Sequence, residues 1–128
     1  MIPLKQENIK QLSEKVLDLL AKTSVEIGHK TDAQTLATLS KIFANDLMTE
    51  RRFFNLYFYQ IEEAFKIGVR FGKDEPFLNI RTFYKWVYQH KKKIDEAEYS
   101  VSTLGNNPKS VPYYQERPKL LTNEKQKY

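Results

Sequence analysis

The stretch that decides the fold is Asn55–Lys93, which reads NLYFYQIEEAFKIGVRFGKDEPFLNIRTFYKWVYQHKKK. Its apolar residues recur every three or four positions on both sides of a short segment that holds glycine, acidic residues and proline. This spacing is typical of two amphipathic helices joined by a turn. We therefore predict helices over residues 56–70 and 80–99. Trp86 is expected at the centre of the core, because a large ring is used where much area can be buried.

Two further amphipathic helices are predicted upstream. The first covers residues 8–22, with Asn8 as a suitable N-cap. The second begins near Asp32, because Thr31 and Gln34 have the spacing of a capping box. The expected buried stripes are Ile9, Leu12, Val16, Leu19 and Leu20 in the first helix, and Leu36, Leu39, Ile42, Phe43 and Leu47 in the second.

Several residues of the central stretch receive individual predictions. Residues 49–54, TERRFF, are interpreted as a connection that phenylalanine anchors to the core while the arginines stay solvated. Glu62 and Glu63 are expected to point away from the apolar stripe, on a solvated face. Because neighbouring helical residues diverge by about 100°, the pair is poorly placed to act as a catalytic dyad or to bind one metal. Gly68 is expected to allow another helix to approach closely. His90 is interpreted as a half-buried residue of the apolar stripe rather than a catalytic one.

The chain is predicted to be an all-α protein, a small bundle of about four main helices followed by an extended or disordered C-terminal tail. Its 128 residues suffice for one compact domain. The proposed division is a helical domain over residues 1–99 and a tail over 100–128, in which helical periodicity is lost and prolines recur. No residue after Ser100 is expected to belong to the core. The tail residues considered as partner contacts are Tyr113, Tyr114, Leu120 and Leu121.

Composition and missing motifs argue against an enzyme. The chain has no cysteine and only two histidines, His29 and His90, whose surroundings match no metal site. Phosphate-binding loops and hydrolase signatures are absent from the sequence. We expect no catalytic residues, no cofactor and no bound metal. Without a signal peptide or an apolar run of about 20 residues, a cytoplasmic protein with no membrane contact is expected.

The positive signal is the segment Arg81–Lys93, RTFYKWVYQHKKK, with five basic residues, four aromatic residues and no acid. The chain carries a net charge of +5, and the basic excess lies in its C-terminal half. Such a segment suits nucleic acid, since cations meet phosphates and rings stack on bases. In the alternative interpretation, which we prefer, the rings belong to the core and the lysines to a solvated edge. The candidate binding residues are Arg51, Arg52, Arg81, Lys85, Lys91, Lys92 and Lys93.

The order of elements from Leu36 to Trp86 resembles that of small phage and prophage replication proteins of the non-ATPase helicase-loader or replisome-organiser type. The matching segments are LSKIFANDL, ERRFF, IEEAFKIGVR and FLNIRTFYKWV, and the resemblance covers about half of the chain. It implies a compact helical domain that contacts a replicative helicase or another replication protein. It also implies that the tail is a second contact surface, and that the location is the host cytoplasm if a phage encodes the protein.

The sequence therefore favours a non-enzymatic adaptor in phage or mobile-element DNA replication. Two alternatives stay open. One is a protein that binds nucleic acid directly through the basic aromatic helix, with weak and non-specific contacts as the expected mode. The other is a structural or virion-associated protein whose helices serve oligomerisation.

Overall fold

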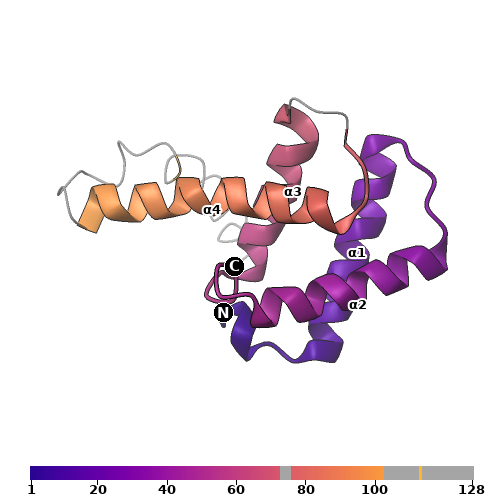
Figure 1. Cartoon of the computed structure of the whole chain (residues 1–128), viewed down its shortest axis with the longest axis horizontal. Coiled ribbons are helices and arrows are strands. Elements are labelled where there is room, and N and C mark those ends of the chain that lie inside the picture. The colour runs from indigo at the N-terminus through magenta and orange to yellow at the C-terminus, as the bar shows by residue number, and fades with distance from the viewer. Residues whose placement is uncertain (73–75, 103–112, 114–128) are drawn as a thin grey trace, which may run out of the picture. The chain divides into compact units, whose positions relative to one another are not determined.

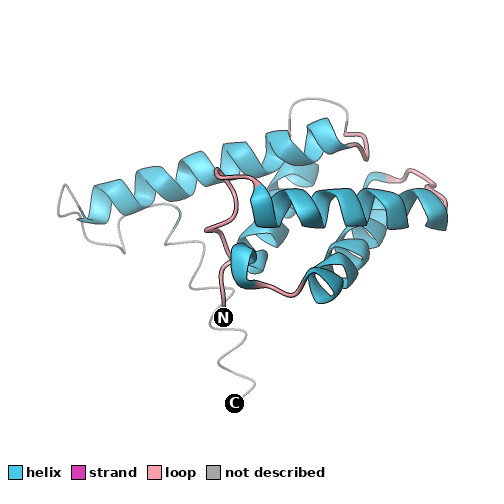
Figure 2. Ribbon diagram, turned by 60° about the horizontal axis from the view of Figure 1, so that its bottom comes forward, coloured by secondary structure: helices cyan, strands magenta, loops and turns pink. Residues whose placement is uncertain are grey.

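The computed structural model describes residues 1–72, 76–102 and Tyr113. Helices and loops make up these ranges, and no strand occurs within them (Figure 2). The prediction of an all-α protein with four main helices is confirmed. The elements, shown in Figure 1, are a short 3-10 helix η1 (Leu4–Gln6) and the α-helices α1 (Ile9–Ile27), α2 (Ala33–Thr49), α3 (Phe58–Phe71) and α4 (Ile80–Ser102). None of the helices in the described ranges combines the length and apolar character that a bilayer crossing requires.

The chain forms two compact units, Met1–His90 and Lys91–Tyr128. Helix α4 contributes its first half to one unit and its second half to the other. It ends at Ser102, three residues beyond the predicted end at Tyr99. The proposed division into residues 1–99 and 100–128 stays a prediction.

Helix α1 starts where the sequence places it and ends later. The Asn8 side chain accepts hydrogen bonds from the backbone N–H of Lys10 and Gln11 at 3.0 and 3.2 Å, as expected of an N-cap. The helix continues to Ile27 rather than residue 22, so the predicted end is wrong. Gly28 ends the helix, because it adopts a left-handed conformation with φ 73° and its backbone N–H donates to the carbonyls of Ser24 and Val25. The buried Thr23 fits within the helix, because its hydroxyl donates to the Leu19 carbonyl at 2.7 Å.

Helix α2 is capped by Asp32, which corrects the predicted capping box of Thr31 and Gln34. The Asp32 carboxylate accepts from the hydroxyl and the backbone N–H of Thr35 at 2.6 and 3.0 Å. These bonds, the hydroxyl's first, hold the pKa of the Asp32 carboxyl below its usual value. Ile42 is 45% exposed and Ile9 of α1 is 46% exposed, so the assignment of these two residues to the buried stripes is also wrong.

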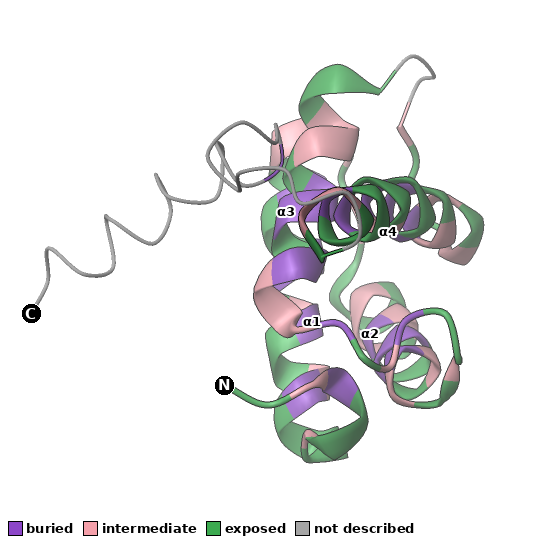
Figure 3. Cartoon of the chain, turned by 90° about the vertical axis from the view of Figure 1, so that its left-hand side faces the viewer, coloured by how far each residue is buried: buried purple, intermediate pink, exposed green. Residues whose placement is uncertain are grey.

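Four aromatic side chains form the centre of the first unit. Phe43 of α2, Phe65 of α3 and Phe83 of α4 meet with ring centroids 5.1–5.9 Å apart. Trp86 packs edge-on against Phe65 at 5.2 Å and is only 6% exposed, which confirms its predicted place in the core. Each helix carries its buried residues along one side and exposed residues along the other (Figure 3). Because its rings come from α2, α3 and α4, the aromatic cluster joins three helices whose residues are distant in sequence.

Gly68 allows α3 and α4 to approach closely, as predicted. A Cβ atom at this position would overlap the indole ring of Trp86. The glycine is therefore required for contact between helices, since α3 has an ordinary helical backbone here.

The N-terminal segment docks on the connection between α2 and α3. The backbone N–H of Leu4 donates to the Leu56 carbonyl at 2.8 Å, and that of Lys5 donates to the Phe54 carbonyl at 3.0 Å. Phe53 is fully buried in this connection, while Arg52 and its neighbour in sequence, Arg51, are exposed. The prediction of a connection anchored by phenylalanine with solvated arginines is confirmed.

In the second unit, the α4 residues Ile94 and Ala97 are buried. Lys91 pairs with Asp95 one turn further along α4, at 2.5 Å. Tyr113 is 3% exposed, so the expectation that no residue after Ser100 is buried is wrong at this position. As a predicted partner contact, a buried ring offers little surface.

The other tail residues considered as partner contacts, Tyr114, Leu120 and Leu121, lie outside the described residues.

Candidate functional site

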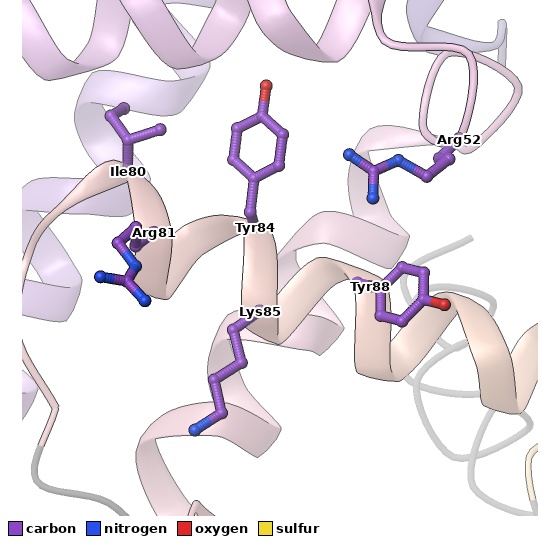
Figure 4. A pocket seen from close by; sticks show the side chains of 6 residues that line it. All are labelled: Arg52, Ile80, Arg81, Tyr84, Lys85 and Tyr88. Carbon is purple, nitrogen blue, oxygen red and sulfur yellow. The ribbon is translucent and has the colours of Figure 1, made fainter.

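An open groove with a volume of about 460 Å³ lies where the start of α4 meets the connection that follows α2. Figure 4 shows the six side chains that surround it. They are Arg52 from the connection and Ile80, Arg81, Tyr84, Lys85 and Tyr88 from α4. All six belong to the first compact unit, and we call this site the α4 groove.

The helical repeat explains why α4 supplies five of the lining residues. Ile80, Tyr84 and Tyr88 stand four residues apart, so they follow one side of the helix. Arg81 and Lys85 form the adjacent row, also four residues apart. Asn79 fixes the start of these rows, because its side chain accepts from the backbone N–H of Thr82 at 2.9 Å, as an N-cap does.

Tyr84 is held in place at both its ring and its hydroxyl group. The ring packs edge-on against Phe53 at 5.3 Å and lies 6.2 Å from the ring of Phe43. Burial, and then the hydrogen bond to the Asp46 carboxylate, raise the pKa of Tyr84 well above its usual value. The hydroxyl is protonated at neutral pH, as in any tyrosine, and can donate to the Asp46 carboxylate.

Arg52 is held by an acid and by two rings. Its Nε donates to Glu50 Oε1 at 3.0 Å. Its guanidinium carbon lies 5.5 Å from the ring centroid of Phe53 and 5.8 Å from that of Tyr88, within the range of cation–π contacts. The bond to Arg52 lowers the pKa of the Glu50 carboxyl, and the same bond raises the pKa of Arg52. Both groups are charged at neutral pH, and the guanidinium has a defined orientation.

The charge of the groove predicts the charge of what it binds. Three lining residues are cationic, and none of the six lining residues is acidic. Across residues 1–90, however, 13 Lys and Arg stand against 11 Asp and Glu, a balance of only +2. Glu50, which pairs with Arg52, offsets part of the charge of the lining residues. The positive excess is therefore local and small, and it suits a short acidic segment better than a long polyanion.

Of the binding residues predicted from sequence, the structure brings Arg52, Arg81 and Lys85 together in the groove. Arg51 is exposed but does not line it. Lys91–Lys93 belong to the second unit, where Lys92 and Lys93 are exposed.

Sequence reasoning missed the apolar part of the groove. The sequence analysis assigned none of Ile80, Tyr84 and Tyr88 to a site. The four-residue spacing of these three residues was the available signal. Among the described residues, no three His, Asp or Glu side chains gather as metal ligands would.

No protein-family model, no curated protein and no solved structure matches this chain. The groove itself therefore carries the functional argument.

Proposed function

We propose that this protein is a non-enzymatic adaptor that holds an acidic segment of a protein partner in the α4 groove. The observation that carries the proposal is that Arg52, Arg81 and Lys85 line one groove together with Ile80, Tyr84 and Tyr88, without an acid among the six lining residues. Charged groups around an apolar centre are typical of protein-binding surfaces, in which rings and Arg supply much of the affinity.

The aromatic contacts favour a peptide over a nucleic acid. A base stacks on an open ring face, and stacking supplies much of the affinity for single strands. Tyr84 already packs against Phe53 and Phe43, and the Arg52 guanidinium lies against the ring of Tyr88. The groove presents cationic and apolar side chains side by side, and an acidic residue next to an apolar one can contact both.

The setting in DNA replication rests on the resemblance to small phage replication proteins. Two of the matching segments, ERRFF and FLNIRTFYKWV, contain every groove residue except Tyr88. This overlap supports a replication protein, such as a replicative helicase, as the partner that supplies the acidic segment.

The test is capture of partners by the tagged full chain from the organism in which it functions, after nuclease treatment. The groove variant is Arg81→Glu/Lys85→Glu. The control is Lys22→Glu/Lys66→Glu, which makes the same change in charge at exposed positions outside the groove. We expect a replication protein to be retained by the wild type and the control and lost from the groove variant.

Two results would contradict the proposal. If the groove variant retains the partner, the partner does not bind in the groove. If nuclease releases everything that the wild type captures, direct binding of nucleic acid becomes the better explanation.

A further inference from the structure

We infer that the α4 groove recognises a carboxylate that stands next to an apolar side chain, that the guanidinium of Arg52 receives this carboxylate, and that Glu50 positions Arg52 to do so. This inference rests on the proposed function and specifies the chemistry of the partner segment.

Glu50 holds Arg52 at two points. Its Oε1 atom accepts from Arg52 Nε at 3.0 Å and lies 3.4 Å from the Arg52 backbone nitrogen. The acid therefore fixes the side chain relative to its own backbone, in a connection that the buried Phe53 anchors. An arginine held in this way loses less conformational entropy when it binds a ligand.

The engagement of Nε determines which edge of the guanidinium is left for a ligand. The two terminal nitrogens point into the groove on the side of Tyr84 (Figure 4). A carboxylate matches such a pair of donors with two parallel hydrogen bonds. A lysine presents a point charge and cannot form this pairing. The side chain of Arg52 is 52% exposed, so the edge can be reached from solvent.

The part of the groove beside this edge is apolar, and the hydroxyl of the tyrosine that lines it has its own hydrogen-bond partner. Ile80 and the ring of Tyr84 line the groove, and the Tyr84 hydroxyl is engaged by Asp46. An apolar side chain of the partner can cover this part of the groove without leaving a polar group unpaired. Arg81 and Lys85 add attraction for further acidic residues of the same segment.

The inference is tested with a peptide array. The probes are decapeptides in a Gly/Ser background that carry one Leu, Phe or Trp and one Asp, one to four residues apart. Matched peptides replace Asp by Asn or by phosphoserine, and a labelled oligothymidine of twelve nucleotides represents nucleic acid. The affinity of the best peptide is then measured by fluorescence polarisation with the full chain and its variants.

We expect peptides with both an apolar residue and Asp to bind and their Asn analogues to lose binding. Arg52→Lys should weaken the best peptide by roughly tenfold or more, because the bidentate bond to a charged group is lost. Glu50→Ala should weaken it several-fold, although this variant makes the protein more positive. Glu50→Gln keeps an oxygen that can accept from Arg52 Nε, so its affinity should equal or exceed that of the wild type.

Whether Glu50→Ala weakens or strengthens peptide binding decides whether Glu50 positions Arg52 or only reduces the positive charge of the groove. If Glu50 merely reduced the positive charge, both Glu50 variants would bind the acidic peptide more tightly, and the inferred role of Glu50 would be wrong. If no peptide binds, or if phosphoserine or the oligothymidine is preferred to Asp, carboxylate recognition is overturned. In that case the adaptor function would still be supported if the Arg81→Glu/Lys85→Glu variant lost the captured partner. Failure of carboxylate recognition can therefore be distinguished from failure of the adaptor function.

Discussion

The carboxylate of Glu63 on α3 lies 3.3 Å from Nε2 of His90 on α4, and both side chains are buried. These residues stand close in sequence to the two aromatic side chains, Phe65 and Trp86, that pack α3 against α4. A polar contact thus accompanies the apolar packing of the same two helices. This contact contributes to stability only when both residues are present, because a buried polar group that loses its partner is destabilising.

The Glu63–His90 pair predicts an unusual pattern of stabilities. Glu63→Met or His90→Leu should each lower the free energy of unfolding by about 1–3 kcal/mol, because each leaves a polar group in the core without this partner. The double variant replaces both groups by apolar side chains and should lose less than either single variant. Urea unfolding of the four proteins measures this double-mutant cycle. Additive losses would show that the two residues are not coupled.

Glu63 also shows where the sequence analysis failed. Both Glu62 and Glu63 were expected on a solvated face; Glu62 is exposed, but Glu63 is buried. An apolar stripe is recognised from hydropathy, and hydropathy alone does not show that an acid is paired across two helices. His90 was expected to be half-buried because of its place in the stripe, but its contact with Glu63 was not expected.

Gly68→Ala should destabilise the protein, against the usual effect of this substitution in a helix. Alanine normally stabilises a helix interior by about 0.5–1 kcal/mol relative to glycine. At Gly68 the added methyl group would overlap the indole of Trp86, and overpacking of this kind costs about 1–3 kcal/mol, so a net loss of up to about 2 kcal/mol is expected. Thermal unfolding measures the change, with Lys66→Ala as an exposed control on the same helix. A more stable Gly68→Ala protein would show that the helices can move apart.

The N-cap of α2 should make part of the stability dependent on pH. The folded pKa of Asp32 is lowered by its bonds to Thr35, so its contribution is present above the unfolded pKa of about 3.9 and is lost as the pH falls through the lower, folded value. The difference in Tm between the wild type and Asp32→Ala should therefore shrink between pH 7 and acidic conditions below about pH 4.

The N-cap of α1 provides a control that does not titrate. Asn8→Ala should cost about 1 kcal/mol, and this difference from the wild type should stay nearly constant over the same interval. If the effects of the two variants changed in parallel with pH, the acid dependence would not come from Asp32.

The helices and most of the core could be predicted from sequence, because amphipathic periodicity and capping residues act locally. The groove could be predicted only in part. Arg81 and Lys85 were selected from a basic run, but nothing local indicates that Arg52 lines the same groove. That meeting depends on the burial of Phe53 beside Tyr84, which is a tertiary contact between distant segments.

The basic residues of α4 predict a DNA affinity that is weak, non-specific and sensitive to salt. Arg81, Lys85 and Lys91–Lys93 offer a handful of phosphate contacts, for which a dissociation constant in roughly the micromolar range or weaker is expected. Each contact with a duplex adds about −0.9 to the slope of log K against log salt. Labelled single-stranded and duplex DNA should therefore bind less tightly at the higher of two salt concentrations.

The Lys91→Glu/Lys92→Glu/Lys93→Glu protein should bind DNA less tightly and show a shallower slope, while the Lys22→Glu/Lys66→Glu control should retain most of the affinity. Tight binding that discriminates between sequences and changes little with salt requires side chains at base edges. Such a result would make direct binding of nucleic acid the better explanation of the protein's function than the adaptor role, because contacts with phosphates alone cannot produce it.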